Sequence, residues 1–476
     1  MSASVRRSLW RTLVVSVGLF GSAYAATGYR NDGTGVWPGT SAPTAWSLTE
    51  HLLWRTAMPA WSNASPAVGA GKVCVCGEPT SLICADAATG RVAWSAAHDV
   101  LATLTGDEKA KASALVSAGD AAEAELATLR TEVSRLSREA RANPSADASA
   151  RLKTVQDRMG VLKTAVAAAA QYRTPPNQGL IGWSSPSPAI DATGVWALFG
   201  NGVVAAHGLD GALKWSRWLG PPPERMLGYD SGTSASPLRV DDLLVVPFRN
   251  LTALDAATGA VRWTDKRPWP HYGPAAVTKV GGVSMLLLPD GRILRARDGV
   301  ELAKDLADVW YIAPVVAGDV VIYLEARSGA EVIQNGGVTM KAYRLAAAPG
   351  GSVTTTPLWT TKIPAKDPFY GQPVASLGYA YLATSTAELW TVNLTSGAVT
   401  ATRKVAGLTN DTVYAGPMVA GGHLYVGNDS GQTAVLSIGA TPELLRVNAL
   451  EAMRASPAFV DGRVYLRSAN ALYAFQ

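Results

Sequence analysis

The stretch Cys84-Ala-Asp-Ala-Ala-Thr-Gly-Arg-Val-Ala-Trp94 returns almost unchanged as Ala253-Leu-Asp-Ala-Ala-Thr-Gly-Ala-Val-Arg-Trp263. Shorter forms run from His207 to Trp215, from Ala296 to Leu302 and from Val392 to Val399. An aspartate can bond its own turn through its side chain, and a following glycine tolerates the positive φ of a tight hairpin. A tryptophan shortly afterwards offers a large face for packing. We therefore interpret the following as turn and packing residues of a repeat rather than as a binding site: Asp86, Gly90, Trp94, Asp210, Gly211, Trp215, Asp255, Gly259 and Trp263.

A proline precedes each copy of this pattern, usually after Ser, Gly or Ala. The eight prolines are Pro66, Pro188, Pro237, Pro274, Pro314, Pro373, Pro417 and Pro457. After Pro188 the successive spacings are 49, 37, 40, 59, 44 and 40 residues. One four-stranded propeller blade takes roughly 40–50 residues, so the spacing predicts one blade per proline.

Each unit divides into four short apolar runs separated by turns. In the third unit these are Ser236–Arg239, Leu243–Pro247, Leu251–Leu254 and Ala260–Trp263. The last unit stops at its third strand, Ala471–Phe475, and His51–Met58 can supply the missing outer strand. Pairing the two ends of the chain removes exposed sheet edges. The prediction is an all-β, eight-bladed β-propeller over residues 46–476.

The Ala-Leu-Asp-Ala-x-x-Gly-x-x-x-Trp pattern resembles the PQQ-like (quinoprotein-type) β-propeller repeat family. That family includes quinoprotein alcohol dehydrogenases and the outer-membrane assembly factor BamB. The resemblance covers roughly residues 46–96 and 180–476, with a strong motif in three units and a degenerate one in the others. Natural repeats vary in this way. The resemblance implies a fold more specifically than a function.

The interval from Pro66 to Pro188 is 122 residues, far longer than one blade. The excess, residues 100–172, is rich in Ala, Glu, Arg and Leu. Apolar residues recur there at alternating spacings of three and four, in Leu126, Leu129, Val133 and Leu136 and again in Leu152, Val155, Met159, Leu162 and Val166. This spacing predicts an antiparallel α-helical coiled-coil hairpin inserted in the propeller, either a self-contained spur or a docking arm. Asn143-Pro144-Ser145 would end one helix, and Ser145 or Asp147 would cap the next.

The N-terminus has the parts of an export signal. Arg6, Arg7 and Arg11 precede an apolar run from Leu13 to Phe20, and Ala23-Tyr24-Ala25 is a small-x-small cleavage site. The run is too short to span a bilayer, so we expect a cleaved signal peptide at residues 1–25 and an N-terminal extension at 26–45. Removing the three arginines leaves a nearly neutral chain with no basic run, which argues against nucleic acid as a partner. We expect a monomer without a transmembrane segment, in the periplasm, at the outer membrane or outside the cell.

The only cysteines are Cys74, Cys76 and Cys84. Export makes a disulfide feasible. If the hairpin turn between them centres on Thr80, Cys76 faces Cys84, whereas a slip by one residue puts these two on opposite faces. The alternative is three small buried side chains.

Quinoprotein dehydrogenases would share this fold. For such an enzyme the resemblance implies a vicinal Cys-Cys pair over the quinone, and calcium-binding Glu and Asn near a catalytic Asp. Here Val75 separates Cys74 from Cys76, and no Cys-x-x-Cys-His haem motif occurs. The histidines lie far apart in the sequence, although a propeller could gather distant ones on its axis: His51, His98, His207, His271 and His423. We therefore expect no catalytic, cofactor or metal site.

The function that fits these observations is an exported, non-catalytic scaffold, BamB-like, that binds a protein partner in the cell envelope. One alternative is an oxidoreductase using pyrroloquinoline quinone (PQQ) with calcium, or another cryptic enzyme, in the central funnel. A third is a surface carbohydrate binder. Clustering of the aromatic residues outside the repeat on one face would favour this third hypothesis: Trp183, Trp218, Trp269, Trp310 and Tyr311.

Overall fold

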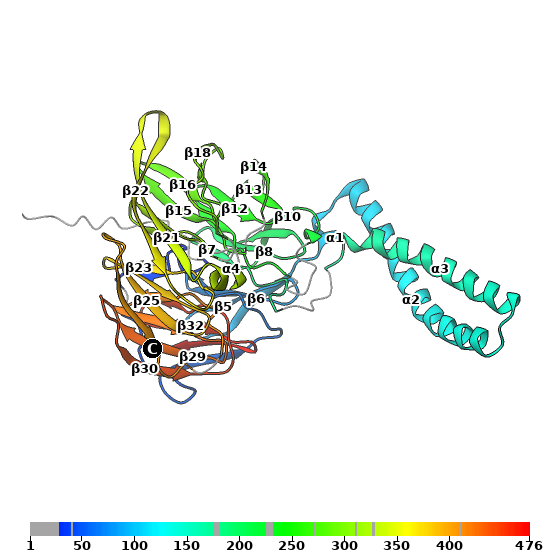
Figure 1. Cartoon of the computed structure of the whole chain (residues 1–476). Coiled ribbons are helices and arrows are strands. Elements are labelled where there is room, and N and C mark those ends of the chain that lie inside the picture. Colours follow the sequence, from blue (N-terminus) through cyan, green and yellow to red (C-terminus); the bar gives the residue numbers. More distant parts are fainter. Residues whose placement is uncertain are drawn as a thin grey trace, which may run out of the picture.

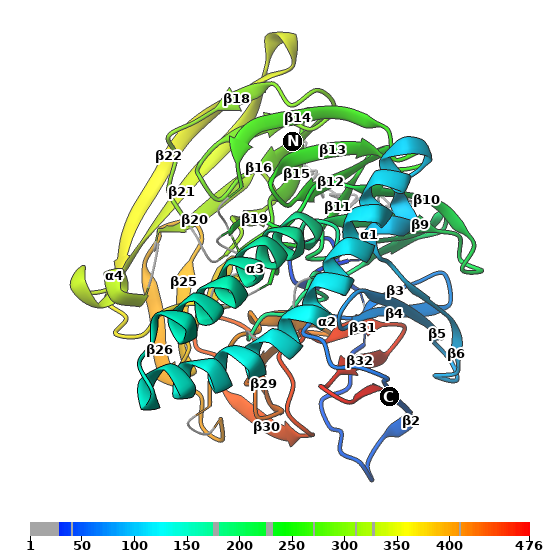
Figure 2. The same cartoon turned by 90° about the vertical axis from the view of Figure 1, so that its right-hand side faces the viewer.

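The computed structural model describes residues 28–39, 41–174, 180–224, 232–269, 272–309, 312–325, 329–408 and 411–476. The expected signal peptide, with its cleavage site after Ala25, lies outside these residues. Within them, nearly all regular structure is antiparallel β-sheet, and the sheets are arranged around a common centre like the blades of a propeller (Figure 2).

The described residues form eight sheets. We number them in chain order by the strand that follows each of the eight prolines, and we call that strand the first strand of its sheet. Sheets 1 to 4 are β3–β6 (Ala67–Gly69, Lys72–Gly77, Ser81–Asp86, Val92–Ala97), β7–β10 (Ala189–Asp191, Gly194–Leu198, Val203–His207, Leu213–Trp218), β11–β14 (Leu238–Val240, Leu243–Pro247, Asn250–Asp255, Val261–Pro268) and β15–β18 (Ala276–Val280, Val283–Leu287, Ile293–Arg295, Glu301–Ala303). Sheets 5 and 6 are β19–β22 (Val315–Ala317, Val320–Glu325, Val338–Ala348, Ser352–Ile363) and β23–β26 (Val374–Ser376, Tyr379–Ala383, Glu388–Asn393, Val399–Lys404). Sheet 7 is β27–β30 (Met418–Ala420, His423–Gly427, Gln432–Ser437, Leu444–Ala449) with β1 (Val36–Trp37), and sheet 8 is β31–β33 (Ala458–Val460, Arg463–Arg467, Ala471–Phe475) with β2 (Leu52–Ala57).

Sheet 8 contains both ends of the ordered ring. As expected, β2 pairs antiparallel with β33, with Thr56 opposite Leu472 and Ala57 opposite Ala471. Strand β2, near the N-terminus, thus completes the sheet that the last three strands of the chain form. This pairing leaves the last C-terminal strand without an open edge.

Burial follows the position of each strand within its sheet. The middle strands are buried on both faces: every residue of β8 and β12 is buried, because each sheet packs between two others. The outermost strands alternate, and β6 and β14 expose every second side chain or more. One cluster of buried side chains joins sheets 2 and 3, with Trp196 and Leu198 against Leu244 and Val246. The hydrophobic core therefore lies between the sheets.

Among the described residues, tryptophans of the outermost strands tie five of the eight sheets to the next sheet. The indole Nε1 of Trp94 donates to the carbonyl oxygen of Leu209 at 3.1 Å. The same bond joins Trp54 to Ala87, Trp215 to Ala256, Trp263 to Ala296 and Trp359 to Leu394. In every case the acceptor lies in the turn between the third and fourth strands of the following sheet.

The glycine of that turn lies flat against the indole ring. A Cβ atom on Gly259 would come within 2.6 Å of the Trp215 ring, and one on Gly211 would come within 2.6 Å of the Trp94 ring. Asp255 holds the turn: its Oδ1 accepts the backbone N–H of Thr258 and the hydroxyl of Thr258, both at 2.9 Å. The hydroxyl bond from Thr258 is the main reason why the pKa of Asp255 is lowered. The aspartate, glycine and tryptophan recur together because each turn must fit the tryptophan of the preceding sheet.

The insertion between sheets 1 and 2 is helical and projects away from the sheets (Figure 1). It consists of α1 (Val100–Thr103), α2 (Gly106–Ala142) and α3 (Ala146–Ala170). At 1.5 Å per residue α2 is about 55 Å long. Ser145 caps α3 by accepting the backbone N–H of Ala148. We call α2 and α3 the arm; a short helix, α4 (Gly329–Gln334), and a 3₁₀ turn (Pro349–Gly351) lie in sheet 5.

The two helices of the arm pack closely against each other. Leu126 and Leu162 are buried between them, and the other apolar residues of the three-four pattern are buried or half-buried. Arg158 forms a bidentate pair with Glu125, with both bonds at 2.7 Å. The base of the arm packs on sheet 2, where Tyr172 contacts Trp218 at 5.5 Å between ring centroids. The arm is thus anchored at its base and in solvent along its length.

Candidate functional site: the axial channel

A pocket of about 340 Å³ lies where the eight sheets meet. Its described walls come from the segments that lead into the first strand of each sheet, and all eight sheets contribute. The lining residues that define it are Asn63 and Ser65 (sheet 1), Ile181 and Ser187 (sheet 2), Ser234 (sheet 3), Tyr272 and Pro274 (sheet 4), Ile312 and Ala313 (sheet 5), Tyr370 (sheet 6), Tyr414 and Ala415 (sheet 7), and Arg454 and Ser456 (sheet 8). We call it the axial pocket.

Serine hydroxyls link the sheets around part of this pocket. The backbone N–H of Ser456 donates to the Ser65 Oγ, that of Ser65 to the Ser187 Oγ, and that of Ser187 to the Ser236 Oγ, each at 2.9 Å. These bonds run in one direction through sheets 8, 1, 2 and 3. In these four sheets a serine precedes the strand-leading proline, and its backbone N–H or its Oγ takes part in the bonds. The proline that follows has no N–H to donate.

Aromatic and basic groups line another part of the pocket. Tyr370 stacks on Tyr414 with ring centroids 5.5 Å apart, and the Arg454 guanidinium lies 5.2 Å from the centroid of Tyr414. The Arg454 Nη1 donates to the Leu180 carbonyl at 3.2 Å. No Asp or Glu is among the described residues that line the pocket. Carboxylate oxygens are the protein ligands that Ca²⁺ most often uses, and the described lining residues supply none.

The other end of the channel is filled by the chain's own N-terminal segment. Gly28 to Asn31 forms a tight turn, with a 2.7 Å bond from the Gly28 N–H to the Asn31 carbonyl. Tyr29, in this turn, lines both the axial pocket and a second cavity of about 290 Å³. The second cavity is walled by the far ends of first strands in sheets 3 and 4, such as Asp241 and Lys279. Residues 28–37 therefore separate the two mouths of the channel, and we call them the plug.

Arg30 holds the plug in place. Its Nη2 donates to the carbonyl oxygens of Pro417 at 2.8 Å and Pro373 at 3.2 Å, the prolines that open sheets 7 and 6. Arg30 is 1% exposed, and among the described residues its Nε and Nη1 have no hydrogen-bond partner. Burial lowers the pKa of its guanidinium. Beyond Arg30, β1 pairs parallel with β27, so the plug extends sheet 7 by one strand.

A pair of histidines lies buried beside the base of the arm. The Nε2 atoms of His98 and His207 are 2.8 Å apart, and the His207 Nδ1 lies 2.9 Å from the Gly211 carbonyl. Burial, followed by the proximity of His207, lowers the pKa of His98 to about 4. The sequence separation of these histidines hid their contact, while His271 falls outside the described residues. Two nitrogen ligands do not make a metal site, and the described residues contain no cluster of three or more His, Cys, Asp or Glu suited to a metal ion.

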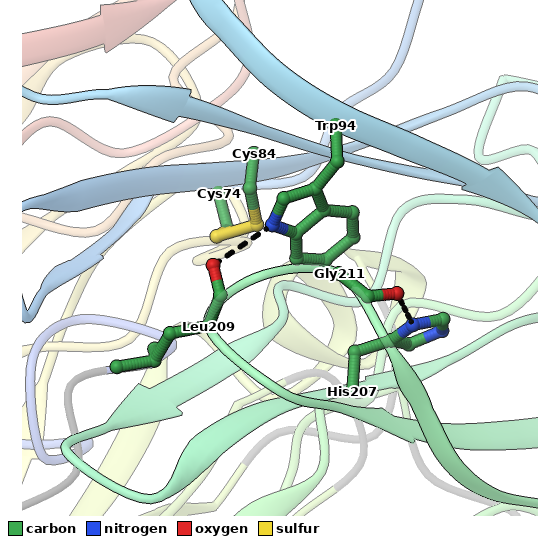
Figure 3. The surroundings of a disulfide bond; sticks show 6 residues. All are labelled: Cys74, Cys84, Trp94, His207, Leu209 and Gly211. Atoms are coloured by element: carbon green, nitrogen blue, oxygen red, sulfur yellow. Dashed lines mark hydrogen bonds between the residues drawn. A yellow bond between two sulfur atoms is a disulfide. The ribbon is translucent and has the colours of Figure 1, made fainter.

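The disulfide joins Cys74 to Cys84, which corrects the predicted pairing of Cys76 with Cys84. The hairpin turn centres on Pro79 rather than Thr80, because Gly77 pairs with Ser81. Moving the centre by one residue moves the partner of Cys84 by two, from Cys76 to Cys74. Figure 3 shows the disulfide beside Trp94 and the Leu209 carbonyl that Trp94 bonds. Cys76 is a free, buried thiol whose pKa is raised by burial.

The aromatic residues outside the repeat do not form a shared exposed face where they are described. Trp183 and Trp269 are buried in the cores of different sheet pairs, and Trp218 packs under the arm. Trp310 and Tyr311 lie outside the described residues. In the part of the chain that the structure describes, no helix has both the length and the apolar character required to cross a bilayer.

Comparison with known proteins agrees with this architecture. The family model described as "Outer membrane protein assembly factor BamB" matches residues 42–177 and 376–476. No curated protein shows a significant match. Among solved structures, a computationally designed protein, Ika8, is 10% identical, with a TM-score of 0.54, 90% of this chain covered and 100% of that chain. This likeness shows the fold alone.

Two natural proteins are also similar. BamB from Moraxella catarrhalis is 18% identical, with a TM-score of 0.40, and the match covers 61% of this chain and 94% of that chain. The structure of U3-55K is 10% identical, with a TM-score of 0.37, 60% of this chain covered and 92% of that chain. By the match of the family model alone, residues 42–177 and 376–476 belong to the PQQ-like β-propeller repeat family described as outer membrane protein assembly factor BamB.

Proposed function

We propose that this chain is an exported, non-catalytic scaffold whose eight-bladed β-propeller binds a protein partner in the cell envelope. The observation that carries the proposal is the match to the BamB family model, whose description names an assembly factor. Eight sheets that all reach one axial pocket support the blade number. We place the mature protein in the periplasm or at the outer membrane.

The disulfide supports export. Cys74 and Cys84 are both fully buried, on adjacent strands of sheet 1. Structural disulfides form and persist in oxidising compartments such as the periplasm and are rare in the cytosol. A protein with a predicted N-terminal export signal and a buried disulfide is expected in such a compartment.

The composition of the axial pocket supports a binding role over catalysis. Among the described lining residues there is no histidine, cysteine or carboxylate that could serve as a general base or a covalent nucleophile beside one. The cysteine bridge spans two strands and is not the vicinal pair of a quinoprotein dehydrogenase. A quinone-dependent oxidoreductase remains the second hypothesis, and isothermal titration of PQQ with calcium into the mature protein tests it: submicromolar binding would favour that enzyme class.

The arm supports a role in which the protein contacts a partner at a distance from the ring. It is fixed at its base by α1 and by Asn201, whose Nδ2 donates to the His98 carbonyl at 2.9 Å and to the Thr174 hydroxyl at 3.2 Å. These two contacts hold the start and the end of the insertion together. An arm held in one direction can present a partner to the ring, whereas a flexible loop could not.

The test is affinity capture from native envelopes with residues 26–476 as bait, using chemical cross-linking and mass spectrometry to locate contacts. Matched baits lack residues 100–172 or carry Gly160→Ala, a change on α3 that meets open space. We expect one envelope protein to be recovered in stoichiometric amount by the full chain and by Gly160→Ala. If neither the full chain nor Gly160→Ala recovers a specific protein, the result contradicts the scaffold function.

A further inference from the structure

The axial pocket is the part of the molecule whose chemistry specifies a ligand most narrowly. Its walls are amphipathic: Ile181, Ile312 and Pro274 are apolar, while Ser65 and Ser456 are polar and nearly fully buried. A volume of about 340 Å³ is at the small end of ligand-binding pockets. It would admit two or three amino-acid residues rather than a folded domain.

Among the described residues that line this pocket, the one charged side chain is that of Arg454. Arg454 lies in the wall, with its side chain 30% exposed. Asp429 is the carboxylate that faces it, but its Oδ2 lies 3.8 Å from the Arg454 Nη2, and its Oδ1 accepts the backbone N–H of Thr412 at 2.9 Å. Arg454 is therefore only partly neutralised.

A second cation lies beneath the pocket floor. Tyr29 forms part of the floor, and Arg30 follows it in the plug. The described acidic residues form no ion pair with Arg30, and two of its nitrogens lack a partner among the described residues. A concave site with cations and low-dielectric walls concentrates the field and attracts anions.

The opposite mouth shows what this channel accommodates. There a turn of polypeptide, Gly28 to Asn31, enters and is held by the carbonyl oxygens of the strand-leading Pro373 and Pro417. The Val419 N–H also donates to the Gly35 carbonyl at 2.9 Å. The channel therefore fits a turn of peptide backbone at one end, and strand-leading segments of all eight sheets line the axial pocket at the other.

We infer that the axial pocket binds an acidic turn of the protein partner, with an Asp or Glu carboxylate on Arg454 and a neighbouring aromatic side chain against Tyr370 and Tyr414. Arginine suits this role because its planar guanidinium can bond a carboxylate through two N–H groups. This inference rests on the proposed function, because it names the chemistry by which the scaffold recognises its partner.

A direct test uses the mature full chain and a fluorescein-labelled peptide amide, Gly-Asp-Phe-Asp-Gly, followed by fluorescence anisotropy at low salt. The matched peptide has Asn in place of both Asp residues. We expect saturable binding of the Asp peptide, at least tenfold weaker binding of the Asn peptide, and at least a tenfold loss with Arg454→Gln. Arg454→Lys should restore part of the affinity, and Arg446→Gln, on the exposed outer strand of sheet 7, should have no effect.

Three results would overturn the inference: equal binding of the two peptides, unchanged affinity in Arg454→Gln, or complete competition by alginate at an equal carboxylate concentration, which would assign the pocket to acidic polysaccharide. Thermal melting of Arg454→Gln shows whether the variant is folded. The capture experiment tests the proposed function independently of this inference. An envelope partner that Arg454→Gln still captures at wild-type level would leave the scaffold role standing and remove the pocket from it.

Discussion

The Nε2 atoms of His98 and His207 lie 2.8 Å apart, although the residues are 109 positions apart in the chain. One ring must donate this bond and the other accept it. Both rings also face a carbonyl oxygen through Nδ1, His207 that of Gly211 at 2.9 Å and His98 that of Thr80 at 3.2 Å. Two neutral rings carry only two N–H groups, so they can satisfy two of these three contacts as hydrogen bonds. The His98 ring stacks on Phe199, and Asp99 is its neighbour in the chain. The pair therefore joins sheets 1 and 2 where the arm begins.

This pair predicts a loss of stability in mild acid. The pKa of His98 is lowered from 6.5 to about 4, so the unfolded chain binds a proton below pH 6.5 that the folded protein takes up only near pH 4. The contribution of neutral His98 to the free energy of unfolding is therefore fully present above pH 6.5 and is lost as the pH falls towards 4. We expect His98 to contribute about 2.5 kcal/mol less to the free energy of unfolding at pH 4.5 than at pH 7.5. Urea denaturation of the wild type and of His98→Gln at both pH values measures this: the pH dependence should be weaker in the variant, and the exposed His51→Gln should behave like the wild type.

The disulfide predicts a specific thiol count. Denatured, unreduced protein should show one thiol per chain, from Cys76, and Cys76→Ala should show none. Because the bridge closes a short loop, removing it with Cys74→Ala and Cys84→Ala should lower the free energy of unfolding by about 2–3 kcal/mol. Peptide mapping that recovers Cys76 linked to Cys84 would contradict the pairing.

The turn glycine and the tryptophan of the preceding sheet predict an unequal response to the same substitution. Gly259 has φ 71° and would place a Cβ within 2.6 Å of the Trp215 ring. Gly282 has φ 80°, but a Cβ there would meet nothing within 4 Å. Both variants to Ala carry the cost of a positive φ, so the difference between them reports the contact with Trp215. We expect Gly259→Ala to be at least about 2 kcal/mol less stable than Gly282→Ala in urea denaturation.

The arm offers a similar matched pair. A Cβ on Gly119 would lie 2.5 Å from the Cβ of Ala169, whereas one on Gly160 would meet open space. Gly119→Ala must push α2 and α3 apart at the base, while Gly160→Ala should stabilise α3 by about 0.5–1 kcal/mol. Limited proteolysis should cut the arm faster in the first variant and more slowly in the second. Equal rates would show that the helices do not pack as closely as Gly119 indicates.

Arg30 predicts a local effect on the plug. In Arg30→Ala the plug loses its bonds to Pro373 and Pro417, so the β1–β27 pairing should open more often. Hydrogen exchange should be at least tenfold faster in Met418–Ala420, where the Val419 N–H is bonded to Gly35. The equivalent first strand of sheet 8, Ala458–Val460, has no plug strand and should exchange as in the wild type. Uniformly faster exchange would instead indicate global destabilisation.

The sequence alone determined what short-range patterns specify. The recurring Asp and Gly predicted the turns, because a turn and its nearest strands lie within one repeat. The recurring Trp predicted a packing residue. The three-four spacing of Leu126, Leu129 and their successors predicted the helices of the insertion, although a coiled-coil geometry there is still a prediction. The strand His51–Met58 was placed correctly because a ring with an incomplete last sheet needs an outer strand.

Only the tertiary structure decided the contacts that depend on register and on distance along the chain. Cys74 rather than Cys76 faces Cys84 because the turn centres on Pro79, and a one-residue change there leaves the sequence pattern unaltered. Arg30 bonds Pro417 across 387 residues, and the axial pocket draws on eight segments, none of which is distinctive by itself. Closing a ring brings such residues together at its axis, and no local pattern in the sequence records which residues meet there.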